Sequence, residues 1–404
     1  MIVKRTIPPL ISIIIPNYQG KEVFPACMNS LLKQDMQHLQ LVFVDDSSTD
    51  GSFNLAKKLF GKYKNIIITK TPNNSGFVGA CNHGLKFCKG KYIAFINNDA
   101  TFPTYWAREM YATVKGKKKV VAATMVLQED LPVQLHKLFK QGLFPVGSVT
   151  YSGCYRRLHP LERKYGRIEL SVNGILMIPR SALGKFIFTP GYFAYGEDID
   201  LCYRLWLRGY RIVGNMQAIM YHYGSYTKKK VPSFSKKAAF HGTKNMITNF
   251  LIFYETKNVL KLAPAFFFLQ FASLIAKPNV IPSRMKSYFW VLLHMGDILK
   301  RRKEIQRTRV LSDEKFFGIL SYKLHEERMA AGRWRAVLVH LANVVMRWYC
   351  KIVRIKTFDI DDANALPTID VSAITPFAIK ESGKIKASGK NRHVVISQDA
   401  AKDI

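Results

Sequence analysis

Four short apolar runs separated by helix-like segments constrain the fold of this chain more than any other feature. The runs cover residues 10–15, 39–44, 65–69 and 92–96 and consist largely of Ile, Val, Leu and Phe. Such runs are typical of strands buried on both faces, as in parallel sheets. The intervening segments 22–33, 52–60 and 77–88 carry apolar residues at helical spacing. This alternation predicts a parallel sheet with right-handed crossover connections.

Three of the predicted strands end in clusters of carboxylates or amides, namely Asp45-Asp46, Asn73-Asn74 and Asn97-Asn98-Asp99. Open α/β sheets bind ligands at the carboxyl ends of their strands, so we expect these clusters to line one crevice. Asn and Asp are also common turn formers, and each cluster taken alone is equally compatible with a turn.

The residue types in this crevice suit a nucleotide and a divalent cation. A carboxylate can accept a hydrogen bond from the N–H of a uracil or thymine ring, and Tyr18 could stack on that ring. A second carboxylate can hold a cation that neutralises a diphosphate leaving group. The glycine-rich motifs of dinucleotide-binding and P-loop proteins are absent after the first strand, as is the H-E-x-x-H zinc motif. No G-x-S-x-G sequence marks a hydrolase nucleophile.

Predicted strands and helices continue along the chain as far as residue 225. Residues 104–115 predict a helix and 120–127 a strand, whereas 128–166 show no clear period and predict a long loop or substrate-specific insert. Strand character resumes at 168–178. Residues 191–200 lead into a helix that ends near Arg208, and two short strands at 210–213 and 218–221 follow, the second running into His222.

Charge is concentrated in the segment that follows. The net charge of the whole chain is +33, and residues 226–356 contribute +19 of it, with 26 Lys and Arg against 7 Asp and Glu. This segment is also apolar, a combination that favours an anionic lipid surface over nucleic acid. Its aromatic residues lie in apolar runs and do not alternate with Arg or Lys as a nucleic-acid stacking platform would.

The apolar runs in residues 258–299 are short for a membrane span. Leu262–Ala276 has 15 residues, contains Pro264 and is followed by Lys277-Pro278, whereas a spanning helix needs about 20. Residues 287–299 precede the cationic cluster Lys300–Lys303. Helices lying in the membrane interface have this pattern, and a helical subdomain packed on the core is the alternative. From residue 357 the low aromatic content predicts a mostly disordered tail.

The six cysteines form no C-x-x-C pair and are sparse for a chain of this length. We therefore expect a reducing compartment and no disulfide framework. The N-terminal residues lack the apolar segment of a signal peptide. These features predict a peripheral protein on the cytoplasmic face of the membrane.

Taken together, several stretches resemble a family 2 glycosyltransferase of the GT-A fold, in the order and spacing of its rhamnosyltransferase-like branch. The resemblance covers roughly residues 10–225 and implies a Rossmann-like, mostly parallel sheet flanked by helices. The matching stretches are Ser12–Gly20, Val44–Ser52, Asn74–Asn82, Phe95–Asp99, Gly191–Arg204, Gly209–Ile212 and His222.

The resemblance implies a role for individual positions in donor binding. Asp46 would contact the nucleotide base in a pocket formed by Pro16, Asn17 and Tyr18. Further donor contacts would come from Asn74, Gly76, Asn82, Asn97 and Asn98. Asp99 would hold Mg²⁺ or Mn²⁺ together with His222. Asn98 stands where many relatives carry a second acid, so we expect metal affinity to be weak without the nucleotide.

The Glu197-Asp198 pair matches the catalytic acids of the family, with Asp198 as the general base. Inverting transfer requires a carboxylate that takes the proton of the acceptor hydroxyl as the new bond forms. Acidic residues at a helix start also cap free N–H groups, and capping and catalysis can coexist. Asp200 faces elsewhere on the same helix, so we expect a structural role for it.

The sequence therefore predicts an inverting, metal-dependent glycosyltransferase. Its donor would be a UDP- or dTDP-sugar and its acceptor a glycan on a polyprenyl-diphosphate lipid, in cell-surface polysaccharide assembly. We divide the chain into a transferase domain (1–225), a membrane-associating helical region (226–356) and a tail (357–404).

Two alternatives remain open. A sugar nucleotidyltransferase also uses an α/β sheet, a metal and nucleotides, but it usually has a glycine-rich phosphate loop that residues 16–20 do not supply. A catalytically degenerate, basic protein that binds lipid or nucleic acid would also account for the charge.

Overall fold

The computed structural model describes residues 8–128, 143–151, 155–162, 166–223, 234–276, 278–324, 333–362 and 365. Its strands are β1 (Ile11–Asn17), β2 (Leu39–Asp45), β3 (Ile66–Lys70), β4 (Tyr92–Phe95), β5 (Ala100–Thr101), β6 (Val120–Gln128), β7 (Leu143–Val149), β8 (Tyr155–Glu162), β9 (Arg167–Glu169), β10 (Leu176–Pro179) and β11 (Arg211–His222). Its α-helices are α1 (Phe24–Leu32), α2 (Ser52–Phe60), α3 (Gly76–Leu85), α4 (Trp106–Val114), α6 (Glu197–Leu207), α8 (Phe234–Phe253), α9 (Thr256–Ala276), α10 (Ile281–Leu293), α11 (Met295–Arg307), α12 (Asp313–Phe317) and α13 (Arg333–Ile352).

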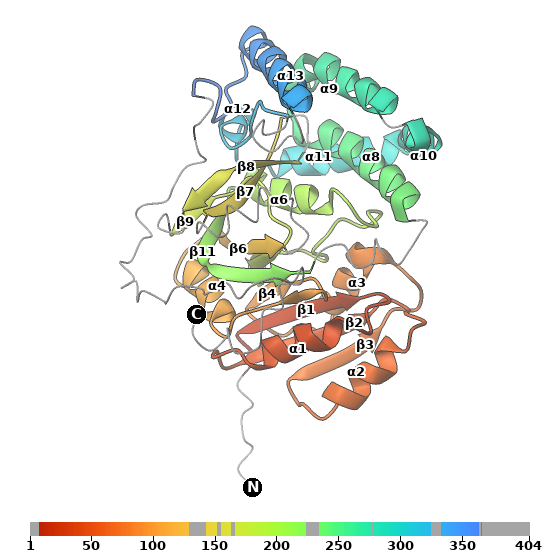
Figure 1. Ribbon diagram of the computed structural model, residues 1–404, viewed down its shortest axis with the longest axis vertical. Coiled ribbons are helices and arrows are strands. Elements are labelled where there is room, and N and C mark those ends of the chain that lie inside the picture. The colour runs from red at the N-terminus through yellow and green to blue at the C-terminus, as the bar shows by residue number, and fades with distance from the viewer. Residues whose placement is uncertain are drawn as a thin grey trace.

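One large sheet organises the first half of the chain, in the strand order β3-β2-β1-β4-β10-β6-β11-β5, with β9 paired to β11 (Figure 1). Strands β1 to β4 are parallel, as predicted. However, β10 is antiparallel to both of its neighbours, and β5 and β9 are antiparallel to β11. The sheet is therefore mixed, but β6 and β11 run in the same direction as β1 to β4, so six of its nine described strands fit the expectation of a mostly parallel sheet. A strand buried on both faces has the same apolar sequence in either direction, so its pattern does not reveal its orientation.

Helices cover both faces of this sheet. On one face α1, α2 and α4 bury a core that includes Phe24, Phe60 and Trp106. On the other face α3 and α6 bury Val78, Leu85 and other apolar side chains against β1 and β4. This second core continues without a break into the C-terminal helices.

The sequence expectations were incomplete in three places between 128 and 222. The segment 128–166 contains the antiparallel hairpin β7–β8, so the prediction of a long loop there is wrong for the described part; residues 129–142, 152–154 and 163–165 lie outside the described residues. The stretch 168–178 holds two strands, β9 and β10. The two short strands expected at 210–221 are one strand, β11, with an irregularity between Gly214 and Ile219.

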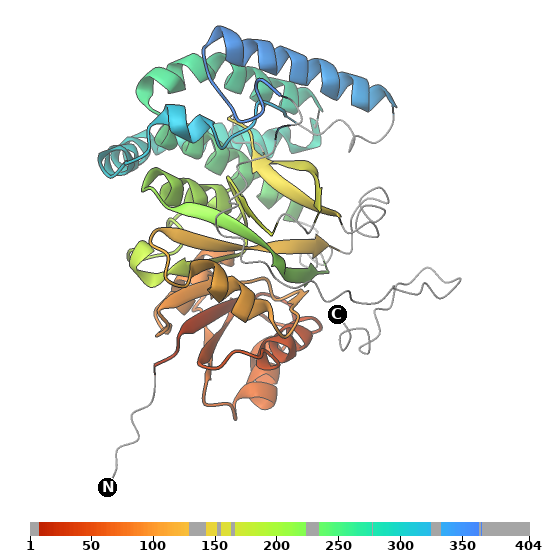
Figure 2. The same ribbon diagram turned by 90° about the vertical axis from the view of Figure 1, so that its left-hand side faces the viewer.

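The C-terminal helices pack on the large sheet through α6 and α8, and Figure 2 shows them as a layer at one end of the molecule. The ring of Tyr203 on α6 contacts Phe253 on α8 with centroids 5.3 Å apart, and Phe250 on α8 stacks on Phe266 of α9 at 4.1 Å. Pro264 lies inside α9 without ending it, and the helix extends over Thr256–Ala276. One face of residues 258–299 is thus packed on the core.

The predicted tail begins later than residue 357. Thr357, Asp359 and Ile360 are buried, and Asp359 accepts hydrogen bonds from the Ser321 hydroxyl and the Tyr322 amide. These residues are therefore part of the folded protein. Residues from 366 onward lie outside the described residues.

Candidate functional site

The carboxyl ends of β1, β2 and β4 lie together because these strands are parallel neighbours. Asn17 is opposite Asp45 in the register of β1 and β2. The Asn17 amide donates to Asp45 Oδ1 at 3.2 Å, and Asn98 Nδ2 donates to Asn17 Oδ1 at 2.6 Å. The structure therefore brings the first and last of the predicted polar clusters to one edge, with Pro16 buried in β1 and Tyr18 half-buried just beyond its end.

Asp46 is fully buried and heavily hydrogen-bonded. Its Oδ1 accepts from the Thr71 hydroxyl at 2.7 Å and from both the backbone and the hydroxyl of Ser75, at 3.0 and 2.7 Å. Its Oδ2 accepts from the Gly76 amide at 2.7 Å. The carboxylate thus holds the turn between β3 and α3, which leaves one lone pair of Oδ2 for the base contact implied by the resemblance.

Gly76 is required by its surroundings as well as by its backbone. Its φ is +71°, and a Cβ there would lie 2.5 Å from the Phe193 carbonyl oxygen. The exposed Asn74 accepts from the Gly76 amide at 3.2 Å. The start of α3 therefore joins the turn held by Asp46 to the segment that precedes the Glu197-Asp198 pair.

Asp99 and His222 meet because β5 and β11 are antiparallel, which places His222 opposite Ala100. The His222 Nε2 atom lies 3.0 Å from Asp99 Oδ1 and 3.0 Å from Asn97 Nδ2. If Nε2 accepts from the Asn97 amide, its lone pair and the carboxylate oxygen face each other. Two such acceptors are stabilised when a cation or proton lies between them.

This pair fits a divalent cation as a partial site. Neighbouring ligands of an octahedral ion, each about 2.1 Å from it, lie roughly 3.0 Å apart, which matches the Asp99–His222 separation. In the described part of the chain no group of three or more His, Cys, Asp or Glu side chains could hold a metal ion. Mg²⁺ commonly keeps waters and takes substrate phosphates as its other ligands, so two protein ligands are compatible with binding that depends on the donor.

Glu197 and Asp198 begin α6 directly after Gly196, whose φ is +80°. Asp198 Oδ1 accepts from the Ile199 amide at 2.8 Å, which is the capping contact that the sequence allowed. Glu197 Oε2 is buried without a hydrogen-bond partner. Burial raises the pKa of Glu197, with a further contribution from the Asp198 charge, and burial also raises the pKa of Asp198. The site therefore holds two carboxyl groups that keep protons more readily than usual.

Glu197 and Asp198, here called the acid pair, lie close to the carboxyl ends of β1, β2 and β4. We call these strand ends the donor edge, because the resemblance implies that the nucleotide binds there. The Cys81 thiol on α3 has its pKa raised well above the usual range, first by burial and then by the charges of Glu197, Cys88 and Asp46. The charges of Glu197 and of Asp46 therefore both act on Cys81 of α3. Because the Val78 amide also donates to the Phe193 carbonyl at 3.4 Å, α3 links the two.

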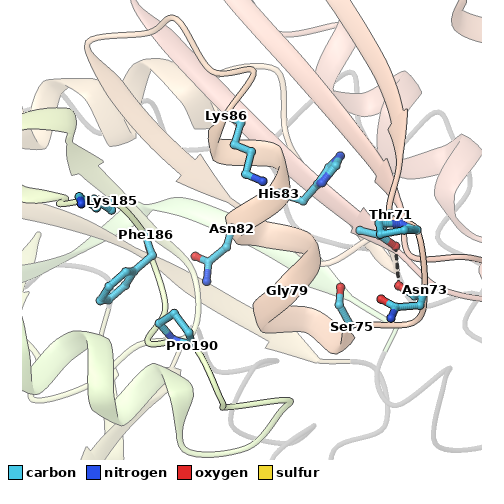
Figure 3. A pocket seen from close by; sticks show the side chains of 11 residues that line it. Thr71, Asn73, Ser75, Gly79, Asn82, His83, Lys86, Lys185, Phe186 and Pro190 are labelled. Atoms are coloured by element: carbon cyan, nitrogen blue, oxygen red, sulfur yellow. Dashed lines mark hydrogen bonds between the residues drawn. The ribbon is translucent and has the colours of Figure 1, made fainter. Parts of the chain in front are cut away.

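Asn82 is hydrogen-bonded to the segment that precedes Glu197, and its donor contact stays a prediction. Its Oδ1 accepts from the amides of Ile187 and Phe188 at 2.9 and 3.1 Å, and its Nδ2 donates to the Phe188 carbonyl at 2.7 Å. Both ends of the amide therefore bind the segment before the acid pair. Asn82 also borders a cavity of about 440 Å³ beside α3, and Figure 3 shows Asn82 pointing toward Phe186 and Pro190 on the opposite wall.

Sequence reasoning missed the contribution of α8. Lys244, Asn245 and Asn249 donate hydrogen bonds to backbone carbonyls of residues 191–196, the loop before Glu197. The available signal was the spacing of polar residues on one face of an otherwise apolar helix. Asp200 is fully buried between Arg204 and Arg301 and accepts from Thr189, in agreement with its expected structural role.

Comparison with known proteins finds similarity over part of the chain. Residues 12–172 match the family described as Glycosyl transferase family 2. A stretch of 124 residues is 34% identical to the uncharacterized glycosyltransferase YibD of Escherichia coli K12, which covers 30% of this chain and 32% of that protein. A stretch of 97 residues is 38% identical to UDP-Glc:alpha-D-GlcNAc-diphosphoundecaprenol beta-1,3-glucosyltransferase WfaP of Escherichia coli, covering 24% of this chain and 36% of that protein.

A third relative is poly(ribitol-phosphate) beta-glucosyltransferase of Bacillus spizizenii, 37% identical over 92 residues, which are 22% of this chain and 14% of that protein. The chain thus spans about a third or less of the length of these three relatives. Among solved structures, that of S. aureus TarS 1-349 is similar with a TM-score of 0.47 and 17% identity, covering 85% of this chain and 90% of that one.

Proposed function

We propose that this enzyme, a glycosyltransferase of family 2 over residues 12–172, moves a sugar from a UDP-sugar to a hydroxyl group of a lipid-linked glycan. The observation that carries the proposal is the meeting of Asp99, His222 and Asn97 at the same sheet edge as Asn17 and Asp45. This arrangement offers amides and a carboxylate to a nucleotide and a partial metal site to its diphosphate. The name of the relative WfaP states a UDP-Glc donor and a diphosphoundecaprenol-linked acceptor, which supports the same chemistry here.

The residues of the chain divide the work of an inverting transfer. Pro16, Asn17 and Tyr18 bind the base, and Asp99 with His222 holds Mg²⁺ or Mn²⁺. When bound, that cation would stabilise the charge that grows on the departing diphosphate. Asp198 accepts the proton of the attacking acceptor hydroxyl. Burial raises the pKa of Asp198, which makes its carboxylate a stronger proton acceptor.

Glu197 supports Asp198. Burial and the neighbouring Asp198 charge raise the pKa of Glu197, so Glu197 keeps its proton while Asp198 is ionised. Two ionised carboxylates side by side would repel each other. A protonated Glu197 leaves one negative charge at the point where the acceptor hydroxyl must lose its proton.

The test is a panel of UDP- and dTDP-sugars offered to the full-length protein with Mn²⁺, first by thermal shift and then with a lipid-diphosphate glycan acceptor. Binding of the correct donor raises the melting temperature by mass action, and transfer releases the nucleoside diphosphate. Release of pyrophosphate would favour the nucleotidyltransferase alternative. No stabilisation by any nucleotide sugar would favour the degenerate binding protein. Membership in the rhamnosyltransferase-like branch stays a prediction, which the preferred donor would test.

We also propose that the enzyme works on an anionic membrane surface, through α9, α10 and α13. These helices carry 17 of the 23 exposed large hydrophobic side chains of the described residues. On α13 they form one stripe that contains Trp334, exposed by 83%, and Trp348, exposed by 65%. Tyr349 of α13 donates to the Lys261 carbonyl of α9, so α13 and α9 are packed side by side at the outer end of the molecule (Figures 1 and 2).

The charges on these helices favour anionic lipid over a second copy of the chain. Within their bounds α9, α10 and α13 contain eight Lys and Arg and no Asp or Glu, so two copies would repel each other face to face. None of the described helices is long and apolar enough to cross a bilayer. Apolar stripes with cationic borders are typical of helices that lie in the membrane interface.

Liposome flotation with and without anionic lipid tests this surface. The wild-type protein should float with anionic vesicles, and Trp334→Ala with Trp348→Ala should weaken binding at least several-fold. Leu59→Ala, on the distant helix α2, is the matched control because it removes an exposed hydrophobic side chain without touching the proposed face. Equal loss in the control, or concentration-dependent dimerisation in place of lipid binding, would contradict the proposal.

A further inference from the structure

Residues 191–196, here called the acid loop, connect the core to Glu197 and Asp198 in an unusual backbone conformation. Gly191, Tyr195 and Gly196 have φ values of +91°, +65° and +80°. For Tyr195 this left-handed conformation costs about 1–2 kcal/mol, because its Cβ approaches the following carbonyl. Strained residues of this kind persist only where the surrounding structure holds them.

Helix α8 supplies the contacts that hold the acid loop. Lys244 Nζ donates to the Gly191 carbonyl at 2.7 Å, and Asn245 Nδ2 donates to the Tyr195 carbonyl at 2.7 Å and to that of Ala194 at 3.2 Å. Asn249 Nδ2 donates to the Gly196 carbonyl at 3.0 Å. Three side chains from one side of α8 thus bind the loop from its first residue to its last.

A second set of contacts holds the same loop from its side chains. The Tyr192 hydroxyl donates to Asn249 Oδ1 at 2.6 Å, and the Arg301 guanidinium of α11 lies over the Tyr192 ring at 5.3 Å. Arg301 also pairs with Asp200 of α6 at 3.2 Å. The loop and the first turn of α6 are therefore fixed to the C-terminal helices at both ends.

Burying these three polar side chains between α8 and the acid loop lowers the stability of the folded protein unless they are hydrogen-bonded. Lys244, Asn245 and Asn249 are exposed by only 4%, 0% and 3%, and burying polar groups destabilises a protein unless they are hydrogen-bonded. Asn245 Oδ1 has no partner among the described residues, so an apolar residue would avoid that cost. The two hydrogen bonds that Asn245 donates to carbonyls of the acid loop offset this cost.

We propose that α8 is a positioning element of the active site, whose residues Lys244, Asn245 and Asn249 hold the acid loop in the conformation that aims Asp198 at the acceptor hydroxyl. The inference rests on the proposed function for the role of Asp198. It gives the C-terminal helices a part in catalysis that is independent of any membrane contact, since the three side chains face the sheet domain.

The experiment compares Asn245→Ala and Asn249→Ala with Thr248→Val in the full-length protein. Thr248 is the matched control because it is equally buried on the same helix, but its hydroxyl donates to the Lys244 carbonyl of its own helix at 2.9 Å. The measurements are kcat, UDP affinity by titration, and amide hydrogen exchange of residues 191–196 and 39–45.

Both Asn variants should lower kcat about 100-fold, as a small misplacement of a catalytic group can, with UDP affinity within about twofold of wild type. Exchange should accelerate in the acid loop and stay unchanged in β2, whereas Thr248→Val should change neither. Should one Asn variant fail to fold, the other and Lys244→Met carry the same test.

Unchanged exchange in the acid loop, or a parallel loss of UDP affinity and kcat, would overturn the positioning role. If no UDP-sugar is transferred by the wild-type protein, the proposed function fails, yet the exchange measurement still decides whether α8 holds the loop. The two failures are therefore distinguishable.

Discussion

Asp46 and Glu197 are both enclosed by protein near α3, yet they differ in how their oxygens are used. Asp46 accepts four hydrogen bonds from the turn between β3 and α3. Glu197 has a buried Oε2 without a partner, and burial raises its pKa. A carboxylate with all its partners stabilises the fold, whereas one that lacks them raises the energy of the folded protein. The comparison shows that the fold satisfies the Asp46 carboxylate, whereas it leaves one oxygen of Glu197 without a partner among the described residues.

The largest expected effect is on chemistry at the acid loop. Asp198→Asn should lower kcat by about 10²–10⁴-fold, because a general base contributes that much. UDP affinity should stay within twofold, since the donor edge is built from other strands. Single-turnover kinetics measure the rate of transfer, and UDP titration measures the affinity for UDP. An equal loss in rate and in affinity would contradict the role of Asp198 as the general base.

The next effect is on stability at the donor edge. Asp46→Asn should lower the free energy of unfolding by about 3 kcal/mol, because an NH2 group then replaces one carboxylate oxygen and faces either the buried Gly76 amide or the buried donors of Thr71 and Ser75. Urea unfolding measures this. Asp50→Asn is the control, since Asp50 also accepts from backbone amides but lies in a partly exposed turn. If Asp46→Asn lowered the free energy of unfolding by less than about 1 kcal/mol, the hydrogen bonds of Asp46 would not stabilise the fold as proposed, and the difference from Glu197 would disappear.

A smaller effect concerns the partial metal site. His222→Ala should raise the Mn²⁺ dissociation constant measured with UDP present by about tenfold or more, and Mn²⁺ binding to the free protein should be weak both before and after the change. Calorimetric titration with and without UDP checks both statements. His83→Ala, a half-buried histidine on α3 that bonds Thr69, is the control. Tight Mn²⁺ binding without nucleotide would contradict the two-ligand site.

The smallest effect is the pH dependence of stability. Because burial raises the pKa of Glu197, the folded protein keeps a proton that the unfolded chain has lost once the pH exceeds the usual carboxyl range. Stability should therefore fall as the pH rises from that range toward the raised pKa. Glu197→Gln should flatten this part of the curve of urea midpoint against pH. If the curve of Glu197→Gln kept the slope of the wild-type curve, a group other than Glu197 would hold the proton that makes stability depend on pH.

Much of the transferase fold was predictable from the pattern of apolar and polar residues. The four parallel strands and three helices of residues 10–96 are present close to their expected bounds. Local periodicity suffices there, because each strand is buried on both faces and each helix buries one stripe. The antiparallel strand β10 and the hairpin β7–β8 were missed, since direction and pairing depend on partners distant in sequence.

The sequence by itself determined which polar residues stand at strand ends, and so it predicted that the clusters containing Asp45 and Asn98 would line one crevice. Tertiary structure alone decided what these groups do. Pairing of β5 with β11 brings His222 to Asp99 across 123 residues, and packing of α8 on the acid loop holds the residues that precede Glu197 and Asp198. Strand-end chemistry is local in sequence, but hydrogen-bond partners and burial are set by contacts between distant segments, and those contacts separate the scaffold carboxylate Asp46 from the unpartnered Glu197.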